Sequence, residues 1–368
     1  MSARSIVHVV VAGEVGGAER MLVDLASAGP DRHAVALVTP SDRLRALFRE
    51  AGLEVEDRGP AREGPLTYLE RSLGPRDVAW LERVLRARRA DVVHVHTFAS
   101  QVLGTRAAAR VGARLVRTEH STRVFDDPSC WPFSRWSLRR ADASVAISEH
   151  IRRRALERAP WASARIEVVP NGVDTARFAE APLPADATTG ALRLLALGRL
   201  DRRKGLDIAF RALAHLHGPV LEIVGEGGEQ ARLEALAREL GVANRVVFSG
   251  FEADVRPAIA RSHLLLSSAR TEGLGIALLE GMAMGRAVAA LPTGGVPEFV
   301  REGETGWLAD GTSPSALARA IRAADRDRAA LAARGERARE LVTRAYDLRA
   351  MREGYARVYA AVVASRRG

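Results

Sequence analysis

A single lysine, Lys204, is the residue in this chain whose type points most directly to chemistry. The sequence holds 55 basic residues, and all of them except Lys204 are arginines. An ammonium is a compact charge on a flexible stem, whereas a guanidinium is a planar fork. Because Lys204 follows Gly198 and Arg199 in one short segment, we interpret it as a charge that faces one phosphate oxygen or a leaving group. The alternative is a stray lysine at a helix start.

Two carboxylates eight residues apart form a second group, with Glu272 before a predicted helix and Glu280 inside it. Gly273 and Gly275 let the backbone approach a ligand closely. The free N–H groups of the helix start, near Gly275 and Ile276, can bind phosphate. Carboxylate oxygens accept hydrogen bonds from paired sugar hydroxyls. The alternative is an acid that the helix dipole favours, followed by a solvated glutamate.

Three glycine-rich turns follow predicted strands in the second half of the chain. They contain Gly198, Gly225 and Gly250, and the aromatic Phe251 follows the last of them. One such turn is a weak signal, but three strand ends along one sheet predict a nucleotide slot. Arg199 precedes Lys204 by five residues, so both cations can converge on a diphosphate.

The elements that must position these residues alternate between short apolar runs and longer amphipathic stretches. This rhythm is typical of βα units and a parallel sheet. Strands are predicted at residues 5–11, 34–38, 91–95, 114–118, 143–147 and 166–169, and then at 192–197, 220–224, 245–248, 263–266 and 287–290. Helices are predicted at residues 18–28, 76–88, 101–111, 205–216, 229–240, 274–284, 314–334 and 347–365.

The length of 368 residues and the restart of this rhythm predict two domains. We expect an α/β domain at residues 1–172, a linker at 173–191, a second α/β domain at 192–345, and a closing helix at 346–368 that packs back toward the first domain. Ligands of open parallel sheets bind at the carboxyl ends of the strands, so the site is expected in a cleft between the domains.

Composition narrows the class of protein. No stretch approaches the roughly 20 apolar residues of a membrane span. The single cysteine excludes an internal disulfide and predicts a cytoplasmic protein. The net charge of +10 is spread evenly over both halves, without a basic low-complexity run, so nucleic acid is not expected as a partner. An anionic small substrate or an anionic membrane face fits this charge equally well.

Two further patterns invite functional interpretations. His94 and His96 have a spacing that could serve a metal, but they end an apolar run, and we expect no metal there. Trp131 and Trp136 lie among arginines at 135, 139 and 140. This segment is either an amphipathic surface that touches a membrane or lipid-linked acceptor, or a helix of the acceptor cleft whose tryptophans pack inward.

These residues resemble one family, the retaining family 4 glycosyltransferases with the GT-B fold, which has two Rossmann-like domains facing each other across a cleft. The resemblance covers essentially the whole chain, and its motifs stand in the family's order. It rests on Arg199 and Lys204, Gly225-Glu226-Gly227, Gly250-Phe251, Glu272 to Glu280, Gly294-Gly295-Val296-Pro297-Glu298, Gly16-Gly17-Ala18-Glu19, His120 and Asn171-Gly172-Val173-Asp174. Leu274 stands where many members carry phenylalanine.

The resemblance implies a role for each donor-side residue. Arg199 and Lys204 would neutralise the donor diphosphate as the glycosidic bond breaks. Glu272 would hold hydroxyls of the donor sugar, and Glu280 would bind the ribose. The base would lie near Phe251. The backbone of the glycine turns and of the helix start would complete the donor site, namely Gly198, Gly225, Gly250, Gly273, Leu274, Gly275 and Ile276.

On the acceptor side, the resemblance implies that Gly16 and Gly17 admit the acceptor and the donor phosphate. His120 would contact the sugar near its reacting carbon. The implied reaction retains anomeric configuration and needs no metal or other cofactor, with a UDP- or GDP-linked sugar as substrate. The acceptor would be a glycan, a lipid-linked molecule or a small molecule, chosen by loops such as residues 66–73 and 121–133.

Two other functions stay open at this point. A sugar-nucleotide epimerase or hydrolase on the same frame would cleave the donor without a sugar acceptor. A non-catalytic binder of sugar nucleotides would turn over nothing. The charged residues at 199, 204, 272 and 280 argue against both.

Overall fold

The computed structural model describes residues 3–12, 15–39, 41–59 and 74–365. The predicted acceptor loop at residues 66–73 lies outside this part. Two compact units of similar size make up the chain. Unit 1 comprises residues 1–172 and 348–368, and unit 2 comprises residues 173–347. Residues 173–191, which we predicted as a linker, are counted in unit 2.

Unit 1 is built on a parallel sheet of seven strands in the order β3-β2-β1-β4-β5-β6-β7. Its strands are β1 Ser5–Val10, β2 Arg32–Leu37, β3 Glu54–Asp57, β4 Val92–Val95, β5 Arg114–Glu119, β6 Ala143–Ala146 and β7 Ile166–Val168. Its helices are α1 Gly17–Ala26, α2 Asp42–Glu50, α4 Pro75–Ala87, α5 Phe98–Val111, α6 Arg123–Asp126, α7 Trp131–Arg140, α8 Glu149–Arg158 and α15 Leu348–Ala364, with a 3₁₀ turn η1 at Pro160–Arg165. Every residue of β1 and β4 is buried, as expected for strands covered on both faces.

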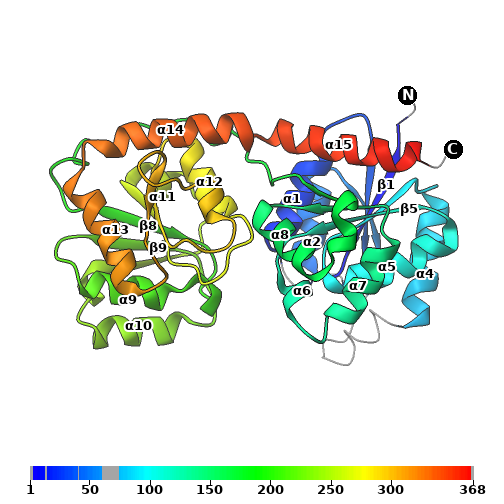
Figure 1. The fold of residues 1–368 in the computed structure, drawn as a ribbon, viewed down its shortest axis with the longest axis horizontal. Coiled ribbons are helices and arrows are strands. Elements are labelled where there is room, and N and C mark those ends of the chain that lie inside the picture. Colours follow the sequence, from blue (N-terminus) through cyan, green and yellow to red (C-terminus); the bar gives the residue numbers. More distant parts are fainter. Residues whose placement is uncertain (1–2, 13–14, 40, 60–73, 366–368) are drawn as a thin grey trace. The chain divides into compact units, whose positions relative to one another are not determined.

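The last helix, α15, completes unit 1 (Figure 1, red). Tyr355 and Tyr359 of this helix are fully buried within one apolar cluster that includes residues of β1, β4 and β5. Their hydroxyls do not remain unpaired, because Tyr359 lies 2.7 Å from Nδ1 of His94 and Tyr355 lies 2.9 Å from Oγ1 of Thr118. The helix therefore supplies both apolar surface and the polar partners of buried strand residues.

Unit 2 is built on a parallel sheet of six strands in the order β10-β9-β8-β11-β12-β13. Its strands are β8 Arg193–Leu197, β9 Val220–Val224, β10 Val246–Gly250, β11 Leu264–Ser267, β12 Val288–Ala290 and β13 Gly306–Leu308. Its helices are α9 Leu206–Ala214, α10 Gln230–Glu239, α11 Arg256–Arg261, α12 Ile276–Ala283, α13 Pro314–Arg326 and α14 Ala330–Ala345, with 3₁₀ turns η2 Arg202–Lys204, η3 Ala243–Arg245 and η4 Val296–Glu298.

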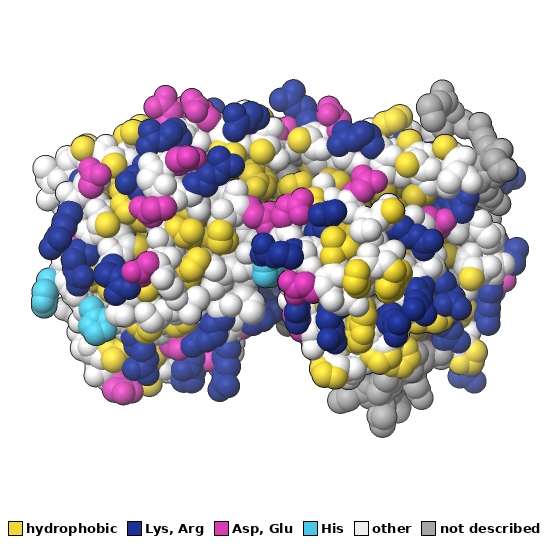
Figure 2. Space-filling view, viewed as in Figure 1, with side chains coloured by type: hydrophobic (Ala, Val, Ile, Leu, Met, Phe, Trp, Pro, Cys, Tyr) yellow, Lys and Arg dark blue, Asp and Glu magenta, His cyan; other side chains and the backbone are white. Residues whose placement is uncertain are grey.

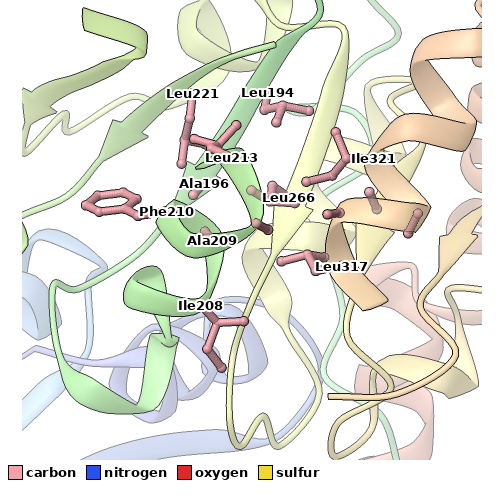
Figure 3. Packing of buried hydrophobic residues seen from close by; sticks show 14 of the residues in the cluster. Leu194, Ala196, Ile208, Ala209, Phe210, Leu213, Leu221, Leu266, Leu317 and Ile321 are labelled. Carbon is pink, nitrogen blue, oxygen red and sulfur yellow. The ribbon is translucent and has the colours of Figure 1, made fainter. Parts of the chain in front are cut away.

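A core of unit 2 lies between this sheet and helices that include α9, α10 and α13. Figure 3 shows Phe210 and Leu213 of α9 beside Leu221 of β9, while Leu317 of α13 points toward Leu266 of β11. All of these side chains are at most 2 % exposed. This apolar packing holds the strands of the sheet in place. The glycine turns and the segment with Lys204 follow the carboxyl ends of these strands.

Two buried or half-buried arginines attach residues 173–191 to the rest of unit 2. Arg286, which is fully buried, donates to the carbonyls of Ala181 and Pro182 at 2.8 and 2.9 Å. Burial lowers the pKa of Arg286 to about 10. Arg328 donates to the carbonyls of Ala187 and Gly190 at 2.7 and 3.2 Å.

The structure corrects the long helix that we predicted at residues 314–334. Helix α13 ends at Arg326, and α14 begins at Ala330. The residue between them that anchors the break is Arg328, because its guanidinium is drawn to the carbonyls at 187 and 190 and to Asp325. Two short edge strands, β3 and β13, were also missed. Edge strands need no apolar run, and β3 consists of three acids and one valine.

Among the described residues, no helix is both long and apolar enough to cross a membrane. On the face that Figure 2 displays, lysine and arginine side chains are spread over both units and not gathered in one run.

Candidate functional site

The lone lysine and the first carboxylate of the pair form an ion pair in unit 2. Nζ of Lys204 lies 2.7 Å from Oε2 of Glu272. The Lys204 side chain is 33 % exposed and that of Glu272 is 18 % exposed, so a ligand can still reach both. Two residues 68 positions apart, chosen from the sequence by their types, are therefore brought together.

The backbone of Lys204 is held by two residues that sequence reasoning missed. Asp201 begins the 3₁₀ turn η2, and its carboxylate accepts hydrogen bonds from the N–H groups of Arg203 and Lys204. Ser268, directly after β11, donates its hydroxyl to the Lys204 carbonyl at 3.0 Å. An aspartate that precedes a helical turn is an ordinary capping signal, and that signal was available in the sequence.

A second ion pair fastens the Glu272 loop to α9. Arg270 makes a two-pronged contact with Asp207, with both N···O distances at 2.7 Å. Hydrogen bonds from the Arg270 guanidinium hold the pKa of Asp207 below its ordinary value. The N–H of Arg270 also donates to the carbonyl of Arg203 at 2.7 Å. These contacts join the loop that carries Lys204 to the loop that carries Glu272.

The backbone of Glu272 is covered by the turn at residues 293–296. Gly294 has a φ of +60°, and a Cβ built on it would lie 1.7 Å from the Glu272 carbonyl oxygen. Gly295 donates its N–H to the same carbonyl at 3.1 Å. Only glycine permits this approach at residue 294, so the turn after the carboxylate pair fixes Glu272 from behind.

A pocket opens beside the ion pair at the carboxyl end of the unit 2 sheet. It is lined by the strand end at Gly198 and Arg199, by Lys204 and Glu272, and by the start of α12 at Gly275 and beyond. The Arg199 side chain is 55 % exposed and lies 3.3 Å from a carboxylate oxygen of Asp201. The remaining lining residues are Ala196, Leu197, Leu206, Ile223, Leu266, Ser267, Ser268, Ala269, Ala277 and Leu278.

The three predicted glycine turns stand on adjacent strands. Gly198 follows β8, Gly225 follows β9, and Gly250 ends β10. They are linked directly, because Gly225 donates its N–H to the Gly250 carbonyl at 2.7 Å. A Cβ on Gly225, whose φ is +148°, would lie 2.0 Å from the Gly198 carbonyl oxygen. The turns therefore form one continuous edge beside the pocket.

We expect Gly225→Ala to lower the free energy of unfolding of unit 2 by roughly 1–3 kcal/mol, because the added methyl collides with backbone and not with a flexible side chain. Trp307 is the only tryptophan of residues 173–347, so its fluorescence during urea unfolding measures this change. Gly228→Ala is the matched control, since a Cβ there meets nothing within 4 Å. Equal stability of the two variants would contradict the close approach.

Several predicted donor residues are not among the residues that line the pocket. Glu280 lies on α12, one turn after its start, and is half-buried. Phe251 follows β10 and is 59 % exposed. Gly273 and Leu274 belong to the loop before α12, and Ile276 is the first residue of that helix.

In unit 1, the predicted acceptor-side residues follow two strands of the other sheet. Gly16 caps α1 at Gly17, and its N–H donates to the carboxylate of Glu19 at 2.9 Å. Burial raises the pKa of Glu19. His120 directly follows β5, and burial lowers its pKa to about 4. His120 is therefore neutral near pH 7.

His94 and His96, where we expected no metal, belong to a larger buried cluster of histidines. His94 lies in β4, His96 follows it, and His8 of β1 joins them, with ring nitrogens of all three within 4.8 Å of one another. His33 of β2 and His120 extend the cluster at its two ends. The sequence did not reveal this, because partners on neighbouring strands depend on strand order and register.

Unit 1 should lose stability as the pH falls below about 6.5, because of these histidines. Burial lowers the pKa of His33 and of His120 to about 4, and burial together with neighbouring histidines lowers those of His8 and His94 well below 6.5. The unfolded chain therefore binds more protons between about pH 6.5 and 4. Each such histidine removes about 1.4 kcal/mol per pH unit in that window.

The measurement is urea unfolding between pH 7.5 and 5 of a Trp307→Phe variant, whose remaining four tryptophans all belong to residues 1–172. Replacing the exposed His215 and His217 of unit 2 by glutamine should leave the pH dependence unchanged. A flat stability of unit 1 across this range would contradict the expectation.

The sequence also contains an Asp-x-Asp pair, Asp325 and Asp327, a pattern that can accompany metal-dependent sugar transfer. It lies at the end of α13, where Asp325 accepts a hydrogen bond from Nε of Arg328 at 2.9 Å. Neither aspartate lines the pocket beside Lys204.

Both halves of the chain match described families. Residues 186–341 match the family "Glycosyl transferases group 1", and residues 15–177 match "Glycosyltransferase Family 4". The chain belongs to the group 1 glycosyltransferases. The motifs on which the resemblance was built, from Gly16 to Glu298, fall within these two matches.

Two curated relatives of this glycosyltransferase differ in their sequence identity to it and in how much of it they match. It is 38 % identical over 241 residues to the GDP-mannose-dependent alpha-(1-6)-phosphatidylinositol monomannoside mannosyltransferase of Mycolicibacterium smegmatis. This alignment covers 58 % of this chain and 62 % of that protein. It is 28 % identical over 358 residues to the lipopolysaccharide core biosynthesis glycosyltransferase LpsE of Rhizobium meliloti, which covers 95 % of this chain and 97 % of that protein.

The fold of this glycosyltransferase is also that of solved structures. HepE of Anabaena, solved in complex with UDP, superposes with a TM-score of 0.84 at 23 % identity, covering 97 % of this chain and all of that one. The predicted GT-B fold is thereby confirmed. The predicted enzyme class is confirmed by the family match and the curated relatives.

Proposed function

We propose that this glycosyltransferase moves a sugar from a nucleoside-diphosphate sugar, linked to UDP or GDP, to an acceptor, with retention of anomeric configuration and without a metal. The observation that carries the proposal is the Lys204–Glu272 ion pair at 2.7 Å beside a row of glycine turns. An ammonium that is held by a carboxylate, yet remains one-third exposed, is preorganised for a ligand that brings both phosphate and hydroxyl groups.

In the proposed reaction, Lys204 and Arg199 neutralise the charge that develops on the leaving diphosphate. Glu272 accepts hydrogen bonds from the donor sugar, and Glu280 binds the ribose. The base lies near Phe251, and the backbone around Gly198, Gly225, Gly250, Gly273, Leu274, Gly275 and Ile276 surrounds the phosphates and the sugar. The cations supply the charge stabilisation that a metal would otherwise provide, and the departing phosphate accepts the proton of the attacking hydroxyl.

Unit 1 contributes the acceptor side in this proposal. Gly16 and Gly17 at the start of α1 admit the acceptor and the donor phosphate, because glycine offers no side chain at the helix entrance. His120 contacts the donor sugar near its reacting carbon. Its low pKa keeps the ring neutral, so it offers one donor and one acceptor nitrogen.

The two rival functions predict different behaviour. An epimerase or hydrolase would consume the donor without an acceptor, whereas a binder would consume nothing. Turnover that depends on an added glycan or lipid acceptor supports transfer. Donor consumption at the same rate without any acceptor would contradict it.

The donor base is the first property to test. The Mycolicibacterium relative is named for GDP-mannose and HepE was solved with UDP, so the relatives leave the base open. The experiment is thermal unfolding of the whole chain with EDTA and a panel of UDP, GDP, ADP, dTDP and their sugar conjugates. A ligand at 100 times its Kd stabilises the native state by about 2.7 kcal/mol.

One nucleotide that stands out with wild-type protein, but not with Lys204→Ala, would support the donor site and name the base. An equal shift in both proteins would place the nucleotide elsewhere. No shift with any nucleotide, followed by no transfer with any donor, would contradict the proposal.

For the acceptor, we propose a glycan or lipid-linked molecule, with the chain in the cytoplasm and in peripheral contact with an anionic membrane. Helix α7 supports this, since Arg135, Arg139 and Arg140 are exposed on it and Phe133 is 42 % exposed. The two tryptophans of the helix are half-buried, and Arg140 lies over the Trp136 ring at 4.8 Å. Co-sedimentation with vesicles of anionic and of zwitterionic lipid separates the alternatives. Binding to neither kind of vesicle would show that α7 does not contact a membrane.

A further inference from the structure

Four histidines of unit 1 form one continuous hydrogen-bonded chain across its sheet. Nδ1 of His33 lies 2.9 Å from Nε2 of His8, and Nδ1 of His8 lies 3.0 Å from Nε2 of His96. Nδ1 of His96 then lies 3.4 Å from Nε2 of His120. The chain runs from β2 through β1 and the end of β4 to the end of β5. Each contact joins an Nδ1 of one ring to an Nε2 of the next.

This regular order leaves the neutral chain only two arrangements. A neutral imidazole carries one proton, and each N···N contact needs one donor and one acceptor. If His33 donates from Nδ1, then His8 and His96 must also carry their protons on Nδ1, and His120 carries its proton on Nδ1 as well. If His120 donates from Nε2, all four rings carry their protons on Nε2. The tautomer at one end therefore determines the tautomer at the other.

The rings are neutral because they are buried. His8 is fully buried and His96 is 5 % exposed. Burial lowers the pKa of both well below 6.5, and that of His33 and His120 to about 4. Asp31 favours the charged form of His33 and Arg4 opposes it. Tyr359, Tyr355 and Thr118 are the polar groups that meet the cluster at His94.

His94 lies beside the chain but outside it. Its Nδ1 is 2.7 Å from the Tyr359 hydroxyl, and its Nε2 is 2.7 Å from the Thr118 hydroxyl. Both ring nitrogens of His94, and both of His8, are thus engaged in hydrogen bonds. The close spacing of His8, His94 and His96 is explained by hydrogen bonding and ring packing. The rings of His8 and His96 are stacked with centroids 5.3 Å apart, and those of His94 and His96 are tilted with centroids 4.1 Å apart.

We propose that His33, His8 and His96 are positioning residues that set the tautomer of His120, and so decide whether its Nδ1 offers a donor or an acceptor to the substrate. The functional part of this proposal rests on the proposed contact of His120 with the donor sugar. Reversing the chain takes up one proton at Nε2 of His33, shifts one proton across each contact, and releases one from Nδ1 of His120. No group is oxidised or reduced, and no further reactant is consumed.

The His33 end of the chain opens to a second cavity. His33 lines it together with Asp31, Tyr359 and Arg352 and other residues of α1, α15 and the turn before β2. A proton can therefore reach His33 from the side of unit 1 where α15 packs, while His120 ends the chain after β5. A network with a purely structural role would need no cavity at its end. Because His33 lines this cavity, position 33 is the one that the experiment changes.

The test exchanges the end of the chain between a donor and an acceptor. Lysine at position 33 can only donate to His8, so His33→Lys should place the His120 proton on Nδ1. An ionised carboxylate can only accept, so His33→Glu should place it on Nε2. The ¹⁵N shifts of the histidine ring nitrogens, recorded on the whole chain at pH 7.5, report each tautomer. We expect opposite majority tautomers of His120 in the two variants.

The control interrupts the chain in the middle. With His8→Phe added, the two variants should give the same His120 tautomer. The same tautomer with His8 in place would overturn the proposal, and so would wild-type spectra in which the four rings do not share one protonated nitrogen, a test that needs no variant to fold. Equimolar zinc that shifts the resonances of His8, His94 and His96 together would also overturn it. None of these readouts depends on sugar transfer, so a failure of the proposed function remains distinguishable.

Discussion

Replacing Glu272 by alanine is expected to lower the rate of sugar transfer by about 10²–10³-fold while the protein stays folded. The carboxylate both holds the ammonium of Lys204 at 2.7 Å and, in the proposed site, binds the donor sugar. Its removal leaves Lys204 free to turn toward solvent, so the charge is no longer preorganised for the leaving diphosphate. The measurement is kcat/KM for the donor found in the nucleotide panel, with circular dichroism to show that the fold is kept.

Glu239→Ala is the matched control, because it removes a carboxylate at the end of α10 in the same unit, away from the residues that line the pocket. Transfer by Glu272→Ala at a rate near that of this control would refute the assignment of the site.

Lys204→Arg asks whether the site needs an ammonium. The Lys204 stem passes Gly198 closely, since a Cβ on that glycine would lie 3.2 Å from Cε of Lys204. A planar guanidinium is wider and cannot reproduce one point charge in this space. We expect this variant to lose most of its activity although its net charge is unchanged. Full activity would show that the single lysine of the sequence is an accident.

Removing the charge of Glu119 is expected to destabilise unit 1 by about 3–5 kcal/mol, because Arg117 would be left as an uncompensated buried cation. Both side chains are at most 1 % exposed, and Nη2 of Arg117 lies 2.7 Å from Oε1 of Glu119. Gln101 and Ser144 donate to the same carboxylate at 3.1 and 3.2 Å. The variant is Glu119→Gln, measured by urea unfolding in the Trp307→Phe background.

Two comparisons separate the loss of the pair from other effects. Glu149→Gln removes an exposed carboxylate of α8 and should change stability little. Replacing Arg117 and Glu119 together by methionine should recover much of the loss, since no buried charge remains. A Glu119→Gln protein as stable as Glu149→Gln would show that Arg117 is not held by this carboxylate.

Most of the fold could be predicted because buried parallel strands read as short apolar runs. The predicted strands at residues 5–11 and 220–224 lie within one residue of β1 and β9. The misses have local physical causes. Strand β3 is polar because it lies at the sheet edge, and the helix predicted at 314–334 breaks where Arg328 leaves the helix pattern to bind carbonyls 138 and 141 residues earlier in the chain.

Part of the candidate site could also be predicted from the sequence. Lys204 was found because it is the only lysine of the sequence, and Glu272 because it stands eight residues before Glu280 at the start of a predicted helix. Ser268 and Asp207, which hold the loops around them, were not found, because a serine after a strand and an aspartate in the first turn of a helix are common and carry no distinguishing pattern. The histidine chain needed the strand order itself, since His8, His33 and His96 become neighbours only when β2, β1 and β4 lie side by side.

The order in which the chain forms the two units affects when each unit can fold during synthesis. Residue 173 pairs with residue 347 in a short parallel bridge, and the N–H of Val173 donates to the Tyr346 carbonyl at 2.8 Å. Unit 2 is therefore an insertion whose two ends meet, and all of it leaves the ribosome before α15 does. Unit 1 has to wait for residues 348–364, with His94 and Thr118 lacking the tyrosine hydroxyls of α15 until then. A nascent chain stopped at residue 347 should resist protease in residues 173–347 while residues 1–172 are digested.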